Sequence, residues 1–202
     1  MRRRHLLAAP VLLARPGHAA TAEGAAAGAL IAALRAGNVV VVLRHGITDR
    51  SQVDTGDLVN RAGQRNLSEA GRAQSLRLGR AFAALGIPLG AVLTSPVFRA
   101  RDTAELAFGA RAVVEPLLTA DDYTPDPGQL TRQIAWLRER AGRPSAPGVT
   151  DVLVGHIVPL GMALGRNLSQ AEYPEGGLAV FAPGGRMLGI LGPQTLFAAA
   201  GE

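Results

Sequence analysis

The sequence predicts an α/β fold of three layers, α/β/α, with a mostly parallel central sheet and a C-terminal hairpin. Residues 39–43, 91–94 and 151–154 are short apolar segments of the kind that forms strands buried on both faces. Segments with helical periodicity lie between them, and strands that alternate with helices favour a parallel sheet with right-handed crossovers. The chain of 202 residues, 48% of them hydrophobic and 18% charged, is long enough to bury the core of one domain.

The first 22 residues have the pattern of a secretory signal peptide. A basic stretch at residues 2–5 is followed by a short apolar run at residues 6–14, and Ala-Thr-Ala at residues 20–22 resembles a cleavage site. The pair Arg3-Arg4 resembles a twin-arginine signal, so we expect an exported, periplasmic protein whose single domain spans residues 23–202. The apolar run is too short for stable membrane insertion and is interrupted by Pro10. The alternative is a cytoplasmic protein with an arginine-rich tail.

Charge and composition exclude several classes of function. The formal net charge is +5, but four arginines and no acid lie in the first 22 residues, which leaves 17 arginines against 16 acidic residues in the rest, or +1. A nearly neutral domain lacks the clustered basic face that nucleic-acid binding needs. The chain has no cysteine, which excludes disulfides, thiolate metal sites and a cysteine nucleophile.

The remaining elements follow from periodicity and turn residues. A lead-in helix is expected over residues 23–35, and the long polar segment 47–67 is expected to be a loop that lines a pocket. Ser68 is a good N-cap for a helix that ends at Gly86, and Ser95-Pro96 predicts the start of the next helix. A further helix is expected around residues 130–137, and residues 178–181 and 187–191 read as the C-terminal β-hairpin.

Basic side chains follow three of the predicted strands. Arg44 and His45 come directly after the first strand, Arg99 falls in the first turn of the helix after the second, and His156 follows the last. Because ligands of open α/β sheets bind at the carboxyl ends of the strands, we expect these four side chains to converge there. Guanidinium groups match phosphate oxygens, and the crowded positive charge favours a neutral, nucleophilic imidazole. The sequence therefore predicts a site for a phosphoryl group.

Four stretches, in the correct order between residues 39 and 160, resemble the histidine phosphatase superfamily, also called the phosphoglycerate-mutase-like family. They are Leu43-Arg44-His45-Gly46 with Thr48, the helix start at residues 67–74, the segment TSPVFRARDTAE at residues 94–105, and Val154-Gly155-His156. The resemblance implies that His45 is the nucleophile that becomes phosphohistidine, that Arg44, Arg99 and His156 hold the phosphoryl oxygens, and that no metal or other cofactor is needed. Ile47 and Asp49 depart from the sequence that many members have after Arg-His-Gly.

The resemblance also implies an acidic proton donor in the variable middle segment. No sharp motif marks it in this sequence. The candidates are Glu115, Asp121, Asp122 and Asp126, of which we favour Asp122.

These features predict a compact, metal-independent phosphomonoesterase that acts on a small phosphorylated substrate. His156 is followed by Ile157 and not by an aspartate, which argues against the larger phytase-like branch, and only 56 residues separate Arg99 from His156, too few for a bulky cap. Two alternatives remain: a phosphohistidine protein phosphatase, and a catalytically idle module that binds phosphorylated ligands. The sequence predicts neither the physiological substrate nor the oligomeric state.

Overall fold

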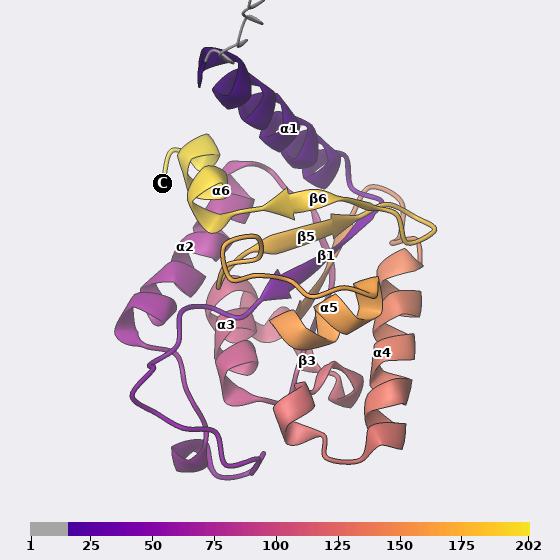
Figure 1. Cartoon of the computed structure of the whole chain (residues 1–202). Helices are drawn as coiled ribbons and strands as arrows, with labels where there is room; N and C mark the ends of the chain where they lie inside the picture. Colours follow the sequence, from indigo (N-terminus) through magenta and orange to yellow (C-terminus); the bar gives the residue numbers. More distant parts are fainter. Residues whose placement is uncertain (1–15) are drawn as a thin grey trace, which may run out of the picture.

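A computed structural model of the protein describes residues 16–202, with side chains from residue 24 onward. Its centre is a six-stranded sheet with the strand order β3-β2-β4-β1-β5-β6 (Figure 1). The strands are β1 (Val39–Arg44), β2 (Leu89–Thr94), β3 (Ala112–Val114), β4 (Thr150–Gly155), β5 (Leu178–Phe181) and β6 (Met187–Leu191). Strands β3, β2, β4 and β1 are parallel, whereas β5 pairs antiparallel with both β1 and β6. The predicted α/β class, the mostly parallel sheet and the C-terminal hairpin are confirmed.

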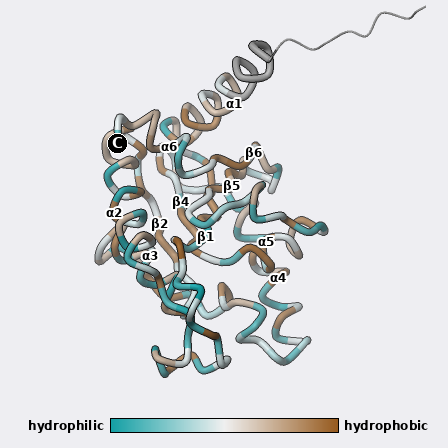
Figure 2. Tube along the Cα trace, turned by 60° about the vertical axis from the view of Figure 1, so that its left-hand side comes forward, coloured by the Kyte–Doolittle hydropathy of each residue, from teal (hydrophilic) through white to brown (hydrophobic). Residues whose placement is uncertain are grey.

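Helices cover both faces of the sheet. They are α1 (Pro16–Ala36), α2 (Glu69–Ala84), α3 (Phe98–Phe108), α4 (Pro127–Gly142), α5 (Ile157–Leu164) and α6 (Pro193–Ala200). One face of the sheet packs against α1, α2, α3 and α6, and the other packs against α4 and α5. Figure 2 shows hydrophobic segments along the strands between these layers and hydrophilic ones along the loops at the lower end of the molecule.

The valine run of β1 is explained by its place in the middle of the sheet. Val39, Val41 and Leu43 point into the core beneath α1, α2, α3 and α6, whereas Val40 and Val42 point into the core beneath α4 and α5. Successive side chains of a strand alternate between its faces, so a strand covered on both sides is apolar throughout. Each such valine contributes about 1.5–3 kcal/mol by leaving water.

The lead-in helix is longer than predicted at its N-terminal end. Helix α1 begins at Pro16 and therefore crosses the boundary predicted at residue 22; the rest of the predicted signal peptide, residues 1–15, lies outside the described residues. Leu30 and Leu34 are its buried anchors in the core. The helix ends at Ala36. The next residue, Gly37, has a φ of 73° and lies so close to Gly148 that a Cβ would come within 2.5 Å of the Gly148 carbonyl carbon. Within the described residues, no helix is long and apolar enough to cross a membrane.

The start of α3 differs from the prediction. The helix begins at Phe98 with Val97 at the N-cap position, and no side chain caps it, so Ser95 is not the cap and Pro96 is not the first helical residue. The Ser95 hydroxyl oxygen instead accepts a hydrogen bond from the Val97 N–H and pairs with His156. Arg99 still falls in the first turn. By contrast, Ser68 caps α2 as predicted, since its hydroxyl accepts the Gly71 N–H at 3.1 Å.

The polar segment 47–67 is a folded loop. In Figure 1 it leaves the arrowhead of β1 and runs to the lower end of the molecule before it returns to α2. An isolated bridge between Thr48 and Leu67 and a hydrogen bond from the Asp49 N–H to the Asn66 carbonyl join its two ends. The loop also contains a short helical turn, η1 (Arg61–Gly63), capped by Asn60. These contacts close the base of the loop.

Candidate active site

The two histidines lie side by side because they follow neighbouring parallel strands. Arg44 at the end of β1 is the register partner of Gly155 at the end of β4, and the His45 N–H donates to the Gly155 carbonyl. The next residue of each strand therefore leaves the sheet at the same level. The ring centres of His45 and His156 are 5.4 Å apart.

The His45 ring is held in one orientation by its own backbone. Its Nδ1 lies 2.9 Å from the Gly46 carbonyl oxygen, which can only accept, so Nδ1 carries the proton and Nε2 keeps its lone pair. The Gly46 N–H in turn donates to the Thr103 hydroxyl at 2.8 Å. Burial lowers the pKa of His45 well below the usual 6.5, and the charges of Arg99 and Arg44 lower it further, although the hydrogen bond to Gly46 partly opposes them. The imidazole is therefore neutral at pH 7.

His156 differs from His45 in which ring nitrogen has a hydrogen-bond partner. Its Nε2 pairs with the Ser95 hydroxyl at 2.9 Å, and its Nδ1 is buried without a hydrogen-bond partner. The Ser95 oxygen accepts the Val97 N–H, and its hydroxyl can either donate a hydrogen bond to Nε2 or accept one from it. Burial lowers the pKa of His156 well below its usual value, and the charges of Arg99 and His45 add to that effect. Nδ1 is thus a buried ring nitrogen without a protein partner.

Arg44 is fixed by the segment that leads into β5. Its Nη1 donates to the Tyr173 carbonyl at 2.6 Å, and its backbone is bonded to Gly176 and Gly177. Burial lowers the pKa of Arg44, and the charge of Glu175 opposes that shift. Glu175 itself accepts the Thr48 hydroxyl at 2.8 Å.

Arg99 reaches the same place from the first turn of α3. Its side chain is 4% exposed, and its Nη1 lies 3.0 Å from both carboxylate oxygens of Asp54. Its Nη2 lies 3.5 Å from Asp122, and its Nε is buried without a partner. The guanidinium is therefore anchored mainly through one nitrogen.

Of the four acidic candidates, the structure brings Asp122 to these cations. Asp122 lies in η4 (Asp121–Tyr123), is 44% exposed at its side chain and is the candidate that pairs with Arg99. Burial raises the pKa of Asp122, Arg99 opposes that, and the charges of Asp54 and Asp121 raise it further. Glu115 caps η3 (Pro116–Leu118) through the Leu117 N–H, and Asp126 caps α4 through two backbone N–H groups. Those two carboxylates have structural partners instead, and Asp121 has no ion pair with an arginine of the site.

Buried nitrogens without partners gather around the histidines. In the described part of the chain they include Nε of Arg44, Arg65 and Arg99 together with Nδ1 of His156. The charges of the same three arginines lower the pKa of both histidines. Buried donors are normally satisfied, so this set is suited to an anion with several oxygens. Among the side chains that the structure describes, from residue 24 onward, no three His, Asp or Glu are grouped so as to ligate a metal ion.

Sequence reasoning missed three contributors to the site. Asp54 and Arg65 lie in the loop 47–67, and Glu175 lies in the segment before β5. Only the length of the polar loop pointed to the first two, and no signal marked Glu175. All three reach the site through contacts between residues far apart in the sequence.

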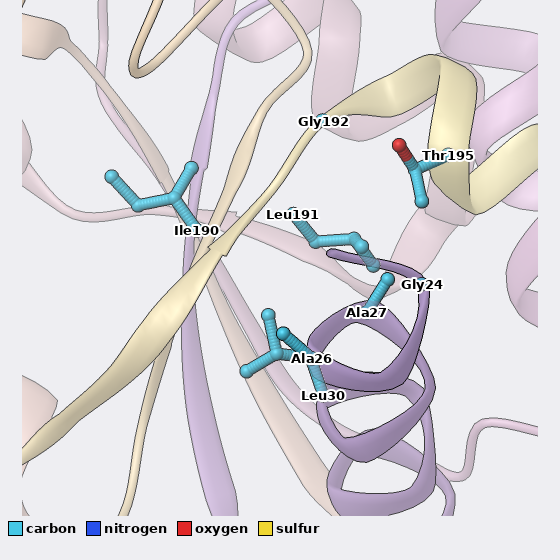
Figure 3. A pocket seen from close by; sticks show the side chains of 8 residues that line it. All are labelled: Gly24, Ala26, Ala27, Leu30, Ile190, Leu191, Gly192 and Thr195. Carbon is cyan, nitrogen blue, oxygen red and sulfur yellow. The ribbon is translucent and has the colours of Figure 1, made fainter. Parts of the chain in front are cut away.

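A surface pocket of 490 Å³ lies elsewhere, between α1 and the end of β6 (Figure 3). Small and apolar residues line it, with the Thr195 hydroxyl as its polar side chain. Its chemistry does not match that of the cationic site.

A sequence model of the histidine phosphatase superfamily (branch 1) matches residues 40–124. Over these residues the chain is similar to the histidine phosphatase superfamily. The matched residues include Arg44, His45, Arg99 and Asp122 but end before His156, which the sheet register brings to them. No curated protein matches the chain by sequence.

Solved structures share the fold of this chain. The protein histidine phosphatase SixA in complex with tungstate has a TM-score of 0.51 and 18% identity, and the match covers 78% of this chain and 99% of SixA. The phosphoserine phosphatase of Entamoeba histolytica in complex with 3-phosphoglyceric acid has a TM-score of 0.52 and 14% identity, with 78% and 98% covered. An H9A mutant of that phosphatase in complex with phosphoserine has a TM-score of 0.53 and 12% identity, with 78% and 98% covered. At these identities the likeness shows the fold.

Proposed function

We propose that the protein is a metal-independent phosphomonoesterase that works through a phosphohistidine intermediate on His45. The observation that carries this proposal is the bond from Nδ1 of His45 to the Gly46 carbonyl, which leaves a neutral Nε2 lone pair among buried cations. A neutral imidazole is a nucleophile, and an imidazolium is not.

In the first step, Nε2 of His45 attacks the phosphorus atom. The N–P bond forms while the P–O bond to the leaving group breaks, and the leaving oxygen takes a proton from Asp122. Arg44, Arg99 and Nδ1–H of His156 would hold the other phosphoryl oxygens and stabilise the charge that spreads over them. The raised pKa of Asp122 supports its role as donor, because a carboxyl group must be protonated to act as an acid.

In the second step, a water oxygen attacks the phosphorus of the phosphohistidine. The N–P bond breaks, the pair of electrons returns to Nε2, and the carboxylate of Asp122 accepts a proton of the water. The products are inorganic phosphate and the starting enzyme. The bond of His45 to Gly46 stays in place throughout.

The alternative within enzymes is a phosphohistidine protein phosphatase. The half-exposed side chain of Asp122 favours it, because a site that leaves its acid open to solvent is accessible to a protein-borne group. The proteins that share the fold include the protein histidine phosphatase SixA and a phosphoserine phosphatase, so such comparisons do not choose between the two substrates.

Hydrolysis of 4-nitrophenyl phosphate tests the proposal, because this leaving group needs little protonation. We expect turnover by the purified protein that added chelator does not reduce. A phosphohistidine-containing peptide and an alkyl monoester, assayed in parallel, separate the two enzyme candidates. Binding of inorganic phosphate without turnover of any of the three would identify a catalytically idle binding module.

A further inference from the structure

Asp54 is the residue of the loop 47–67 that contacts Arg99. Although it lies in a polar loop, its side chain is only 14% exposed. Both of its oxygens lie 3.0 Å from Nη1 of Arg99, and Oδ1 also accepts the Arg65 N–H at 2.8 Å and the Tyr123 hydroxyl. One carboxylate thus joins the loop to α3 and to η4.

The negative charge of Asp54 compensates the positive charge of the buried Arg99 guanidinium. A guanidinium that is 4% exposed requires a nearby anion, and in the described part of the chain two carboxylates contact it. Asp54 is the nearer of them, at 3.0 Å, against 3.5 Å for Asp122. Partial burial raises the pKa of Asp54, but the hydrogen bonds from Tyr123 and Arg65 and the charge of Arg99 outweigh it and lower the pKa overall. Asp54 is therefore ionised at neutral pH.

The contact between Asp54 and Arg99 uses one nitrogen of the guanidinium, Nη1. Both carboxylate oxygens of Asp54 accept hydrogen bonds from Nη1 of Arg99. The opposite edge of the guanidinium, formed by Nε and Nη2, therefore makes no contact with Asp54. Nε on that edge has no partner, and Nη2 makes only the long contact to Asp122. Two adjacent N–H groups on one edge of a guanidinium match two oxygens of a phosphoryl group.

We propose that Asp54 is the positioning residue of this site: it holds Arg99 by Nη1 and so directs the Nε and Nη2 edge at two phosphoryl oxygens. The inference rests on the proposed function, since it assigns the tether of a guanidinium that the mechanism uses. Asp54 remains bonded to Arg65 and Tyr123 while the substrate occupies the other edge. It touches neither the substrate nor the reacting atoms.

This role has a distinctive consequence for Asp54→Asn. The substitution removes a negative charge beside an anion site, so binding of inorganic phosphate should stay within about threefold of wild type or become tighter. The guanidinium of Arg99 is no longer oriented with Nε and Nη2 toward the phosphoryl oxygens, so kcat for 4-nitrophenyl phosphate should fall by about 10- to 100-fold. Loss of loop structure would weaken both together.

Asp57→Asn is the matched control. It makes the same change of charge in the same loop, but the Asp57 carboxylate accepts only the backbone N–H groups of Val59 and Asn60. We expect its kcat to stay within about twofold of wild type.

A double-mutant cycle tests whether Asp54 acts through Arg99. In an Arg99→Lys background, Asp54→Asn should reduce kcat by less than about threefold, because the edge that Asp54 directs is already absent. An equal loss in both backgrounds, or a kcat of Asp54→Asn above half that of wild type, would overturn the proposal.

Orthovanadate binding separates this inference from the proposed function. Vanadate adopts the geometry of the transition state and its binding requires no turnover. Asp54→Asn should weaken vanadate binding about tenfold or more while phosphate binding is kept. A wild-type protein that binds vanadate but hydrolyses nothing would refute the proposed function alone, whereas unchanged vanadate binding by folded Asp54→Asn protein would refute the role of Asp54 alone.

Discussion

The rings of His45 and His156 face each other at 5.4 Å between centres and 52° between planes, and they offer different nitrogens to the space around them. His45 donates through Nδ1 to its own chain and keeps Nε2 as a lone pair, whereas His156 is bonded through Nε2 and keeps Nδ1. The register of two parallel strands places the two rings side by side. The contacts with Gly46 and Ser95 determine which nitrogen of each ring stays without a protein partner.

Replacement of the nucleophile should abolish turnover. His45→Ala removes the group that forms the N–P bond, so we expect no detectable hydrolysis of 4-nitrophenyl phosphate by a protein whose circular dichroism matches wild type. Wild-type enzyme trapped during turnover should carry a phosphoryl group that is stable in alkali and labile in acid, as expected for phosphohistidine. Substantial activity of folded His45→Ala protein would contradict the mechanism.

Arg99→Lys should keep the positive charge but lose the two adjacent N–H donors, Nε and Nη2, of the guanidinium. We expect turnover of 4-nitrophenyl phosphate to fall by about 10- to 1,000-fold, a loss of a few kcal/mol of transition-state stabilisation. Arg101→Lys is the control, because that side chain forms its ion pair with Glu105 of the same helix and lies over the Phe98 ring. If Arg99→Lys changes turnover less than about twofold, the guanidinium does not hold the phosphoryl group.

The dependence of rate on pH should differ between leaving groups. The pKa of His45 is lowered, so its neutral form persists as pH falls through 6.5, and the rate with an aryl phosphate should not decline there. The pKa of Asp122 is raised above 3.8, so its acidic form survives to higher pH than usual and is lost as pH rises through that pKa. The ratio of alkyl to aryl hydrolysis should therefore fall as pH rises.

Asp122→Asn identifies the group behind that fall. In this variant the rate of alkyl monoester hydrolysis should fall by about 10²- to 10⁴-fold, and the rate of aryl ester hydrolysis should fall much less. The ratio of alkyl to aryl hydrolysis should become independent of pH. Asp126→Asn changes a carboxylate that caps α4 and should leave the ratio as in wild type. A pH-dependent ratio in Asp122→Asn would transfer the role to another acid.

Gly71 tests the packing that supports the start of the loop. A Cβ at this position of α2 would lie 1.9 Å from the Ile47 carbonyl oxygen, which is backbone and cannot rotate away. Gly71→Ala should therefore reduce the free energy of unfolding by about 1–3 kcal/mol in denaturant titrations. Gly128→Ala in α4 meets its nearest atom at 3.4 Å and should be neutral or stabilise by up to about 1 kcal/mol.

Export remains a proposal that rests on the first 22 residues. Among the described side chains of α1, the first buried one is Leu30, so removal of the predicted signal peptide would leave both anchors, Leu30 and Leu34, in the core. We expect the mature protein from its native host to begin near Ala20 or Glu23, and Arg3→Lys with Arg4→Lys to retain it in the cell. Intact-mass measurement decides this: a soluble cytoplasmic chain that keeps Arg2 would indicate a cytoplasmic phosphatase with a tail.

Local patterns were sufficient to predict the sheet and its cationic edge. Residues 39–43 and 152–154 are apolar because both faces of their strands are covered, and strand direction determines where the residues that follow them lie. The start of α3 was predicted wrongly because Ser95 has two uses, as a cap or as a partner for an imidazole, and the second depends on a residue 61 positions away. Local capping rules do not take into account that a distant residue, His156, can bind the Ser95 hydroxyl.

The carboxylates show where sequence reasoning stops. Asp122 and Asp126 belong to one acidic segment, and only the folded chain shows that one meets Arg99 and the other caps α4. Asp54 was one of several acids in a loop without periodicity, and its tie to Arg99 spans 45 positions. Such contacts are set by how separate elements pack, which a single sequence does not reveal.

The acceptor that orients His45 is a main-chain oxygen, that of Gly46. In a serine-protease triad the corresponding acceptor is an aspartate side chain, which a single point mutation can delete. No codon change can delete a peptide carbonyl, so the tautomer of the nucleophile is protected against mutation in a way that its cationic neighbours are not. Substitution of the arginines, the acid or the loop residues therefore leaves the acceptor of the His45 Nδ1 proton in place.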